Sequence, residues 1–233
     1  MSRREEVAAG LDAVRRRIVE ACREAGRDES GVHLVVVTKT FPAADVRVLA
    51  ELGVTDVGES RHPEAMHKHS ECAGLGLTWH FAGALQTNKA ADVARYTDVL
   101  HSVDRPRLVD ALARAVHRSE RRLRCLVQVN LDPPGEQSGR IGAKPEDVPA
   151  LADRLAAVRL LEIAGVMGIA PLGRDPAPAF ERLAGVAEDL RERHPGATMI
   201  SAGMSGDLEA AVRYGATHVR VGGAVLGERP LLR

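Results

Sequence analysis

SAGMSGDLEAAVRYGATHVRVGGAVLG, residues 201–227, joins two apolar runs through a Gly/Ser turn and a helical segment, and a pair of glycines follows the second run. Asp207 begins the helical segment, where an aspartate commonly caps free backbone N–H groups. This order predicts a strand–helix–strand unit with two parallel strands. In many α/β barrels the loops after the last two strands bind phosphate through backbone N–H groups.

The same alternation extends back through the whole chain. Apolar runs typical of strands occur at 33–39, 55–58, 77–83, 98–104, 123–131, 161–170, 197–204 and 217–223. Helical patterns separate these runs, and residues 3–25 add an amphipathic helix before the first one. Eight such units predict a (β/α)8 TIM-type barrel that forms a single domain over residues 1–233, with an additional N-terminal helix. A doubly wound open sheet is the alternative.

The composition argues against several classes of protein. Lysine plus arginine equals aspartate plus glutamate at 32 each, so no overall charge attracts nucleic acid or an anionic membrane. The three cysteines have no C-x-x-C spacing, which argues against a disulfide framework and a metal site of the zinc type. No apolar run has the length of a signal peptide core or a membrane span. We therefore expect a cytoplasmic protein that binds neither nucleic acid nor a membrane.

The first apolar run leads into VVVTKTFP (35–42), in which Lys39 is expected to be the last residue of the strand. Because side chains alternate along a strand, Val35, Val37 and Lys39 share one face. A barrel would place Lys39 at the C-terminal rim, where barrel enzymes hold their chemistry. Desolvation there lowers the pKa of a lysine, as imine formation requires. A solvated strand end or a salt-bridge partner is the alternative interpretation.

Arg220 adds a second cation to the last predicted strand. It shares a face with His218 and Gly222, so it points into the barrel if the two valines of that strand pack under helices. A buried arginine keeps its proton and needs a partner, either a carboxylate such as Glu59 or a bound ligand.

The glycine-rich loops contain residue types that allow close backbone approach or donate a hydroxyl, namely Ser201, Gly203, Ser205 and Gly206. The glycines could equally serve the turns alone. A phosphate-binding rim, a lysine on the same rim and an inward arginine together indicate a phosphorylated carbonyl compound. Pyridoxal 5′-phosphate (PLP) meets all three requirements.

Seven segments carry a family pattern from the first predicted strand to the last: VVVTKTFP (35–42), VGES (57–60), WHFAGALQTNK (79–89), HSVDR (101–105), VQVNL (127–131), GVMGIAP (165–171) and residues 201–227. Through them the chain resembles, over essentially its full length, the pyridoxal-phosphate homeostasis protein family. That family is similar to the N-terminal barrel of alanine racemase. The order and spacing of the segments make the resemblance specific.

The resemblance implies a PLP site built from several strand ends. Lys39 would carry the cofactor as a Schiff base, and Arg220 would face the pyridine nitrogen and keep it unprotonated, which makes the ring a poor electron sink. The other expected cofactor-binding residues are Ser201, Met204, Ser205, Gly222 and Gly223 around the phosphate, with Ser60, His80 and Met167 in the rest of the pocket. His80 and Met167 could instead be ordinary core residues.

Several positions depart from the usual family pattern, among them Arg61 in place of a tyrosine and Ala84 in place of a frequent proline. Ser60 stands where the family commonly has asparagine, and Gln137 stands where a lysine often precedes Ser-Gly. Gly223 replaces the usual threonine or serine, which removes one candidate phosphate hydroxyl but keeps the backbone N–H. These changes affect the polar contacts of the expected pocket, while Lys39 and Arg220 are retained.

The function implied by the resemblance is intracellular PLP (vitamin B6) homeostasis, with little or no turnover and no catalytic residue. The alternatives are a PLP-dependent racemase-like enzyme and an aldolase that uses Lys39 toward a sugar phosphate. Racemisation needs acid–base groups on both faces of the substrate. Alanine racemase takes its opposing tyrosine from a further C-terminal domain, and we expect none here because the sequence ends six residues beyond Gly227. The expected partners are PLP and apo-enzymes that require it, and the expected state is a monomer or weak dimer.

Overall fold

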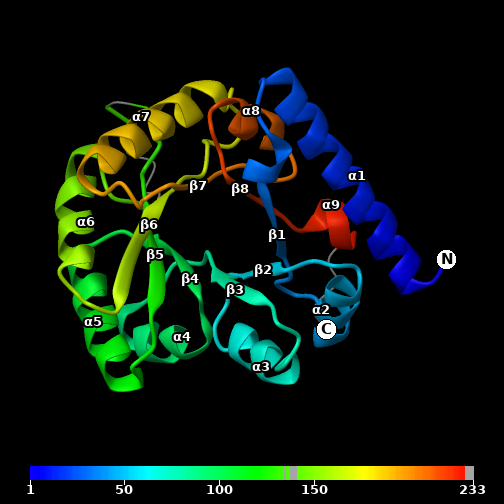
Figure 1. The fold of residues 1–233 in the computed structure, drawn as a ribbon, viewed down its shortest axis with the longest axis horizontal. Helices are drawn as coiled ribbons and strands as arrows, with labels where there is room; N and C mark the ends of the chain where they lie inside the picture. The colour runs from blue at the N-terminus through cyan, green and yellow to red at the C-terminus, as the bar shows by residue number, and fades with distance from the viewer. Residues whose placement is uncertain (134, 137–140, 229–233) are drawn as a thin grey trace.

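The strands of the chain close into a parallel barrel. A computed structural model describes residues 1–133, 135–136 and 141–228. Among these residues each strand pairs with the next, and β8 returns to pair with β1 (Figure 1). The strands span His33–Val37 (β1), Asp56–Glu59 (β2), Thr78–Phe81 (β3), Val99–Val103 (β4), Leu123–Gln128 (β5), Leu161–Met167 (β6), Met199–Ser201 (β7) and His218–Val221 (β8). The predicted (β/α)8 barrel is confirmed, and the open-sheet alternative is wrong.

Helices cover the outside of the barrel (Figure 1). They span Arg3–Glu24 (α1), Ala43–Glu51 (α2), Glu64–Glu71 (α3), Ala90–Tyr96 (α4), Pro106–Ser119 (α5), Val148–Ala156 (α6), Ala177–Arg193 (α7), Leu208–Arg213 (α8) and Gly223–Leu226 (α9), with 3-10 turns at Glu29–Gly31, Thr87–Lys89 and Pro145–Asp147. The sequence did not predict α9, because four residues are too few to show a helical period. In the described ranges no helix is both long and apolar enough to cross a bilayer.

The core has three parts, set by which face of each strand is apolar. Two large clusters combine strand residues with helix residues, so they lie between the barrel and its outer helices. A third, small cluster contains strand residues only and therefore fills the barrel interior: Val99, Leu126, Ala164, Met167 and Met199. The interior is otherwise strongly polar, because His80, His101, Ser201 and Arg220 are buried there. This polar interior underlies the site at the C-terminal end of the barrel.

Candidate functional site

Lys39 lies in a turn two residues beyond the end of β1, so the prediction that it ends the strand is wrong. The Thr38 N–H still donates to the Gly58 carbonyl oxygen of β2 at 2.9 Å. The Thr38 carbonyl oxygen instead accepts from the Phe41 N–H at 3.0 Å, which closes a turn, and from Lys68 Nζ at 2.7 Å. Thr40 then adopts a positive φ of 72°. Alternation nevertheless holds, because Val35, Val37 and Lys39 line one cavity.

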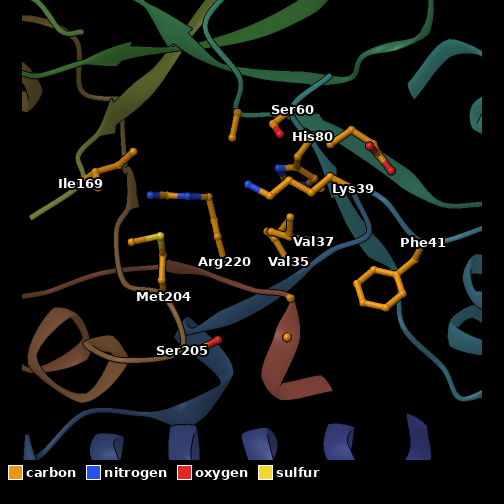
Figure 2. A pocket seen from close by; sticks show the side chains of 15 residues that line it. Val35, Val37, Lys39, Phe41, Ser60, His80, Ile169, Met204, Ser205 and Arg220 are labelled. Atoms are coloured by element: carbon orange, nitrogen blue, oxygen red, sulfur yellow. The ribbon is translucent and has the colours of Figure 1, made fainter. Parts of the chain in front are cut away.

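This cavity of about 200 Å³ opens at the C-terminal end of the barrel, where Lys39 and Arg220 both extend into it (Figure 2). Eight of the expected residues line it: Lys39, Ser60, His80, Met204, Ser205, Arg220, Gly222 and Gly223. Further lining comes from Val35, Val37, Phe41, Gly58, Glu59, Ala82 and Ile169. Sequence reasoning missed Ala82 and Ile169, because small and apolar residues just after a strand carry no distinctive signal.

Two of the expected residues do not line the cavity. Met167 is fully buried in the inner apolar cluster with Val99 and Met199, so it supports the barrel interior. Ser201 is also fully buried, and its hydroxyl contacts side chains of the barrel rather than the cavity. Gln137 lies outside the described residues.

A charged cluster, made of the buried Lys68 and Glu59 and the partly buried Glu64, holds the turn that carries Lys39. Lys68 Nζ donates to Glu59 Oε1 at 2.5 Å and to Glu64 Oε1 at 3.1 Å. Glu59 Oε1 also accepts from the Thr38 hydroxyl at 2.6 Å, and Glu64 Oε1 accepts from the Thr40 N–H at 2.5 Å. Burial raises the pKa of Glu59, an effect that Lys68 and Thr38 oppose. The cluster therefore fixes the backbone on both sides of Lys39.

Arg220 is buried without a carboxylate in direct contact among the described residues. Its Nη1 donates to Ser201 Oγ at 2.5 Å and its Nη2 to the Gly168 carbonyl at 3.1 Å. Burial lowers the pKa of Arg220 to about 10, so the guanidinium remains charged at neutral pH. The suggestion that Glu59 pairs with Arg220 is wrong, because Glu59 is paired with Lys68.

A line of hydrogen bonds crosses the barrel from Arg220 to Asp56, the first residue of β2. Ser201 Oγ lies 2.9 Å from His101 Nδ1, His101 Nε2 lies 2.8 Å from His80 Nδ1, and His80 Nε2 lies 2.8 Å from Asp56 Oδ1. An arginine can only donate, so the Ser201 proton is left to donate to His101.

The donor and acceptor roles then follow for each ring. Burial lowers the pKa of His101 well below its ordinary value, so this ring is neutral and has a single proton. Because Nδ1 accepts from Ser201, that proton is on Nε2. That proton goes to His80 Nδ1, and the His80 proton on Nε2 goes to Asp56. Both nitrogens of His80 are therefore engaged inside the barrel, although His80 also lines the cavity.

Acid should destabilise the ligand-free protein through His101, which is buried, and through His218 of β8, which is partly buried. Burial lowers the pKa of His218 to about 3, and that of His101 falls in the same direction, whereas an unfolded histidine titrates near pH 6.5. Between these values the unfolded chain binds more protons, so stability is complete above about pH 6.5 and falls as the pH drops toward 3. We expect a loss of up to about 1.4 kcal/mol per histidine for each pH unit.

Urea unfolding of the ligand-free protein at pH 7, 6 and 5 measures this loss. His218→Gln should make the slope of unfolding free energy against pH shallower, because this variant removes one titrating group. A free energy of unfolding that stays constant from pH 7 to pH 5 would contradict the assignment of neutral histidine rings.

Comparison with known proteins adds independent findings. A profile of the alanine racemase N-terminal domain matches residues 10–230. The chain is 43% identical to the pyridoxal phosphate homeostasis protein of Mycobacterium tuberculosis over 245 aligned positions, which cover 98% of this chain and 95% of that protein. It is also similar to the structure of PipY from Synechococcus elongatus with PLP bound, with a TM-score of 0.82, 33% identity, and coverage of 95% of this chain and 100% of that one.

A more distant similarity concerns the fold alone. Alanine racemase from Corynebacterium glutamicum aligns with a TM-score of 0.72 at 16% identity. The alignment covers 98% of this chain and 62% of the racemase chain, so the likeness is to part of that protein.

Proposed function

The chain belongs to the pyridoxal phosphate homeostasis protein family, and we propose that it binds PLP in the cavity at the C-terminal end of its barrel. The observation that carries this proposal is the joint presence of Lys39 and Arg220 in one cavity with Ser205, Gly222 and Gly223. When bound, PLP supplies an aldehyde that reacts with amines and a ring that can stabilise negative charge.

The residues of the cavity fit the three parts of PLP. Lys39 offers a primary amine for the aldehyde, and Arg220 offers a group that can only donate, which suits an unprotonated ring nitrogen. Ser205 offers a hydroxyl, and its N–H donates no hydrogen bond to another described residue. A Cβ at Gly222 would lie 2.9 Å from the Val37 carbonyl oxygen, so only glycine lets the backbone pass here. We propose that these loop residues bind the phosphate.

The other residues of the expected set have supporting roles in this proposal. Ser60, His80 and Met204 line the walls of the cavity, and Val35 and Val37 exclude water beneath Lys39. Ser201 positions Arg220 through its hydroxyl, and Met167 packs beneath the cavity. We propose that the whole chain forms one PLP-binding domain.

We propose that the protein stores or delivers PLP with little or no turnover. Racemisation needs a second acid–base group opposite the lysine. Both tyrosines of the chain, Tyr96 and Tyr214, are absent from the lining of the described cavity. His80 has both ring nitrogens in hydrogen bonds and is poorly placed to exchange a substrate proton.

Apo-enzymes that require PLP are the proposed recipients. The three buried cysteines are free thiols, which supports a reducing, cytoplasmic setting for the protein.

Reduction with borohydride tests the binding site. The protein is incubated with PLP, reduced and digested, and its peptides are mapped by mass spectrometry. The four lysines, Lys39, Lys68, Lys89 and Lys144, are far enough apart in sequence to be resolved. A pyridoxyl group on Lys39 supports the proposal, whereas an unmodified Lys39 in a PLP-treated sample would overturn it.

Exchange of the Cα deuterium of labelled amino acids separates the carrier from the racemase-like alternative. We expect stoichiometric PLP without sustained exchange. Sustained exchange would instead favour the enzyme, and Glu59→Gln would then test the one carboxylate in the cavity lining as the second acid–base group. Loss of exchange in that variant would identify Glu59 as the group responsible only where borohydride still traps PLP on Lys39 in full, because Glu59 also holds the turn that carries Lys39.

A further inference from the structure

The additional helix α1 packs directly against the two short helices that follow the proposed phosphate loops. In Figure 1 α1 runs alongside α8 and α9. Its apolar face belongs to the same core cluster as residues of α8 and α9: Val7, Leu11, Val14 and Ile18 from α1, with Leu208, Val212, Val225 and Leu226. The fit is close, because a Cβ at Gly10 would lie 2.4 Å from the Val225 carbonyl oxygen. The helix therefore touches the supports of both loops.

Arg17 connects α1 to the loop after β7. Its Nη2 donates to the Ser205 carbonyl oxygen at 2.9 Å, while its Nε and Nη2 form a two-point contact with Glu209 at 2.7 and 2.9 Å. Ser205 lines the cavity, so the bond ends on the backbone of a proposed phosphate-binding residue. Arg17 and Glu209 are partly exposed, and such a pair contributes little to overall stability. Its effect is instead to fix the orientation of the Ser205 peptide.

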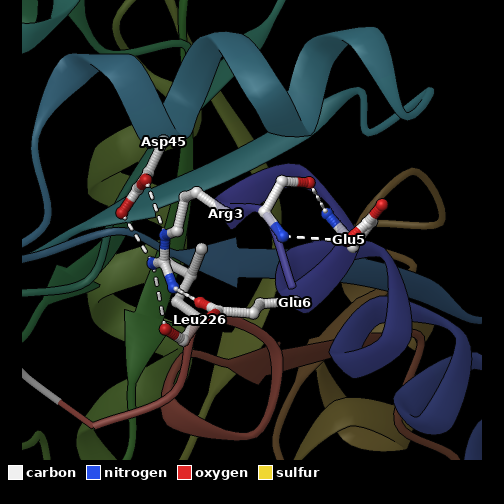
Figure 3. Close-up of polar contacts among 6 residues, drawn as sticks. Arg3, Glu5, Glu6, Asp45 and Leu226 are labelled. Carbon is white, nitrogen blue, oxygen red and sulfur yellow. Dashed lines mark hydrogen bonds and ion pairs between the residues drawn. The ribbon is translucent and has the colours of Figure 1, made fainter.

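Arg3 makes the matching connection to the segment after β8 (Figure 3). Its Nη2 donates to the Leu226 carbonyl oxygen at 3.0 Å, at the end of α9. The guanidinium also binds Asp45 of α2 at two points, 2.9 and 2.8 Å. Because Asp45 is buried, Arg3 is held in one orientation. The backbone from Gly222 to Leu226 is thus tied to α1 as well.

We propose that α1 positions the phosphate-binding loops, and that Arg17 and Arg3 are the positioning residues that act through Ser205 and α9. This inference rests on the proposed function. It assigns the N-terminal helix to recognition of the phosphate and not of the aldehyde or the ring. Loosening α1 should therefore weaken binding of the phosphorylated ligand selectively.

Two ligands separate these effects: PLP and 5-deoxypyridoxal, which has the same aldehyde and ring but no phosphate. Arg17→Gln is expected to weaken PLP binding roughly tenfold, the scale of one lost hydrogen bond to a charged group, and to leave 5-deoxypyridoxal binding unchanged. Arg3→Gln should act in the same direction. Arg23→Gln is the matched control, since it removes the same charge from α1 at an exposed pair with Glu20, and the Arg23 side chain donates to neither loop among the described residues. Absorbance titration measures each affinity.

The variants also keep the inference separable from the proposed function. Wild-type protein that binds no PLP would overturn the proposed function itself. Wild-type binding together with an unchanged PLP affinity in both Arg17→Gln and Arg3→Gln would overturn the role of α1 alone. An equal loss for PLP and 5-deoxypyridoxal, or an equal loss in Arg23→Gln, would likewise overturn it. Thermal unfolding confirms that each variant is folded, and only folded variants are compared.

Discussion

Lys39→Ala protein treated with PLP and borohydride is expected to yield no pyridoxyl adduct at residues 35–42, a complete loss of covalent binding. The amine is the only group at this position that can bond to the aldehyde carbon, and alanine has none. The remaining residues of the cavity, including Arg220 and Ser205, still offer donors for the ring and the phosphate. We therefore expect the variant to retain weak binding that dialysis removes.

Two exposed lysines supply the controls for this experiment. Lys89→Ala and Lys144→Ala each remove one amine from the surface, so the adduct on Lys39 should persist in full. Lys68 is the remaining lysine, and it is buried in its ion pair with Glu59. Transfer of the adduct to Lys68 in the Lys39→Ala protein, in undiminished amount, would contradict the assignment of Lys39. Mass spectrometry of the intact protein before and after dialysis quantifies both forms.

The barrel and the inward direction of Lys39 and Arg220 follow from local patterns in the sequence. Eight alternations of apolar runs with helical segments leave few other ways to bury the apolar faces. Alternation along a strand depends on neighbouring residues alone, so it placed Val35, Val37 and Arg220 correctly on the cavity side.

The rest of the site depends on contacts between distant segments, which no local pattern encodes. The turn after β1 is held in part by Lys68, which reaches Thr38 from a helix thirty residues further along the chain. Of the two partners expected for Arg220, a ligand stays a proposal and the carboxylate Glu59 does not contact it. Closure of the barrel instead brings Arg220 to Ser201 and, through His101, to His80. Each of these side chains has several possible partners until the strand order is fixed.

The buried ion pair behind Lys39 predicts the largest change in stability. Lys68→Met removes the cation from Glu59 and leaves a buried carboxylate, which costs about 3–5 kcal/mol in comparable cases. Glu59 is almost fully buried, and its Oε2 has no hydrogen-bond partner among the described residues. The cost of burying the carboxylate is therefore offset only by the contacts of Oε1 with Lys68 and Thr38. Urea unfolding of the ligand-free protein should report a free energy lower by that amount.

The same substitution should also loosen the turn that carries Lys39, because the Thr38 carbonyl loses one of its two donors and keeps only the N–H of Phe41. Adding Glu59→Gln removes the unpaired carboxylate, so the double variant should recover part of the lost stability. Its PLP affinity should stay as low as that of Lys68→Met, because the hydrogen bond from residue 68 to the Thr38 carbonyl is still missing. Lys89→Met, at an exposed position, should change the free energy by no more than about 0.5 kcal/mol. A Lys68→Met protein as stable as the wild type would show that Glu59 is already neutral in the native state. In that case hydrogen bonding alone, and not charge, would hold the turn around Lys39.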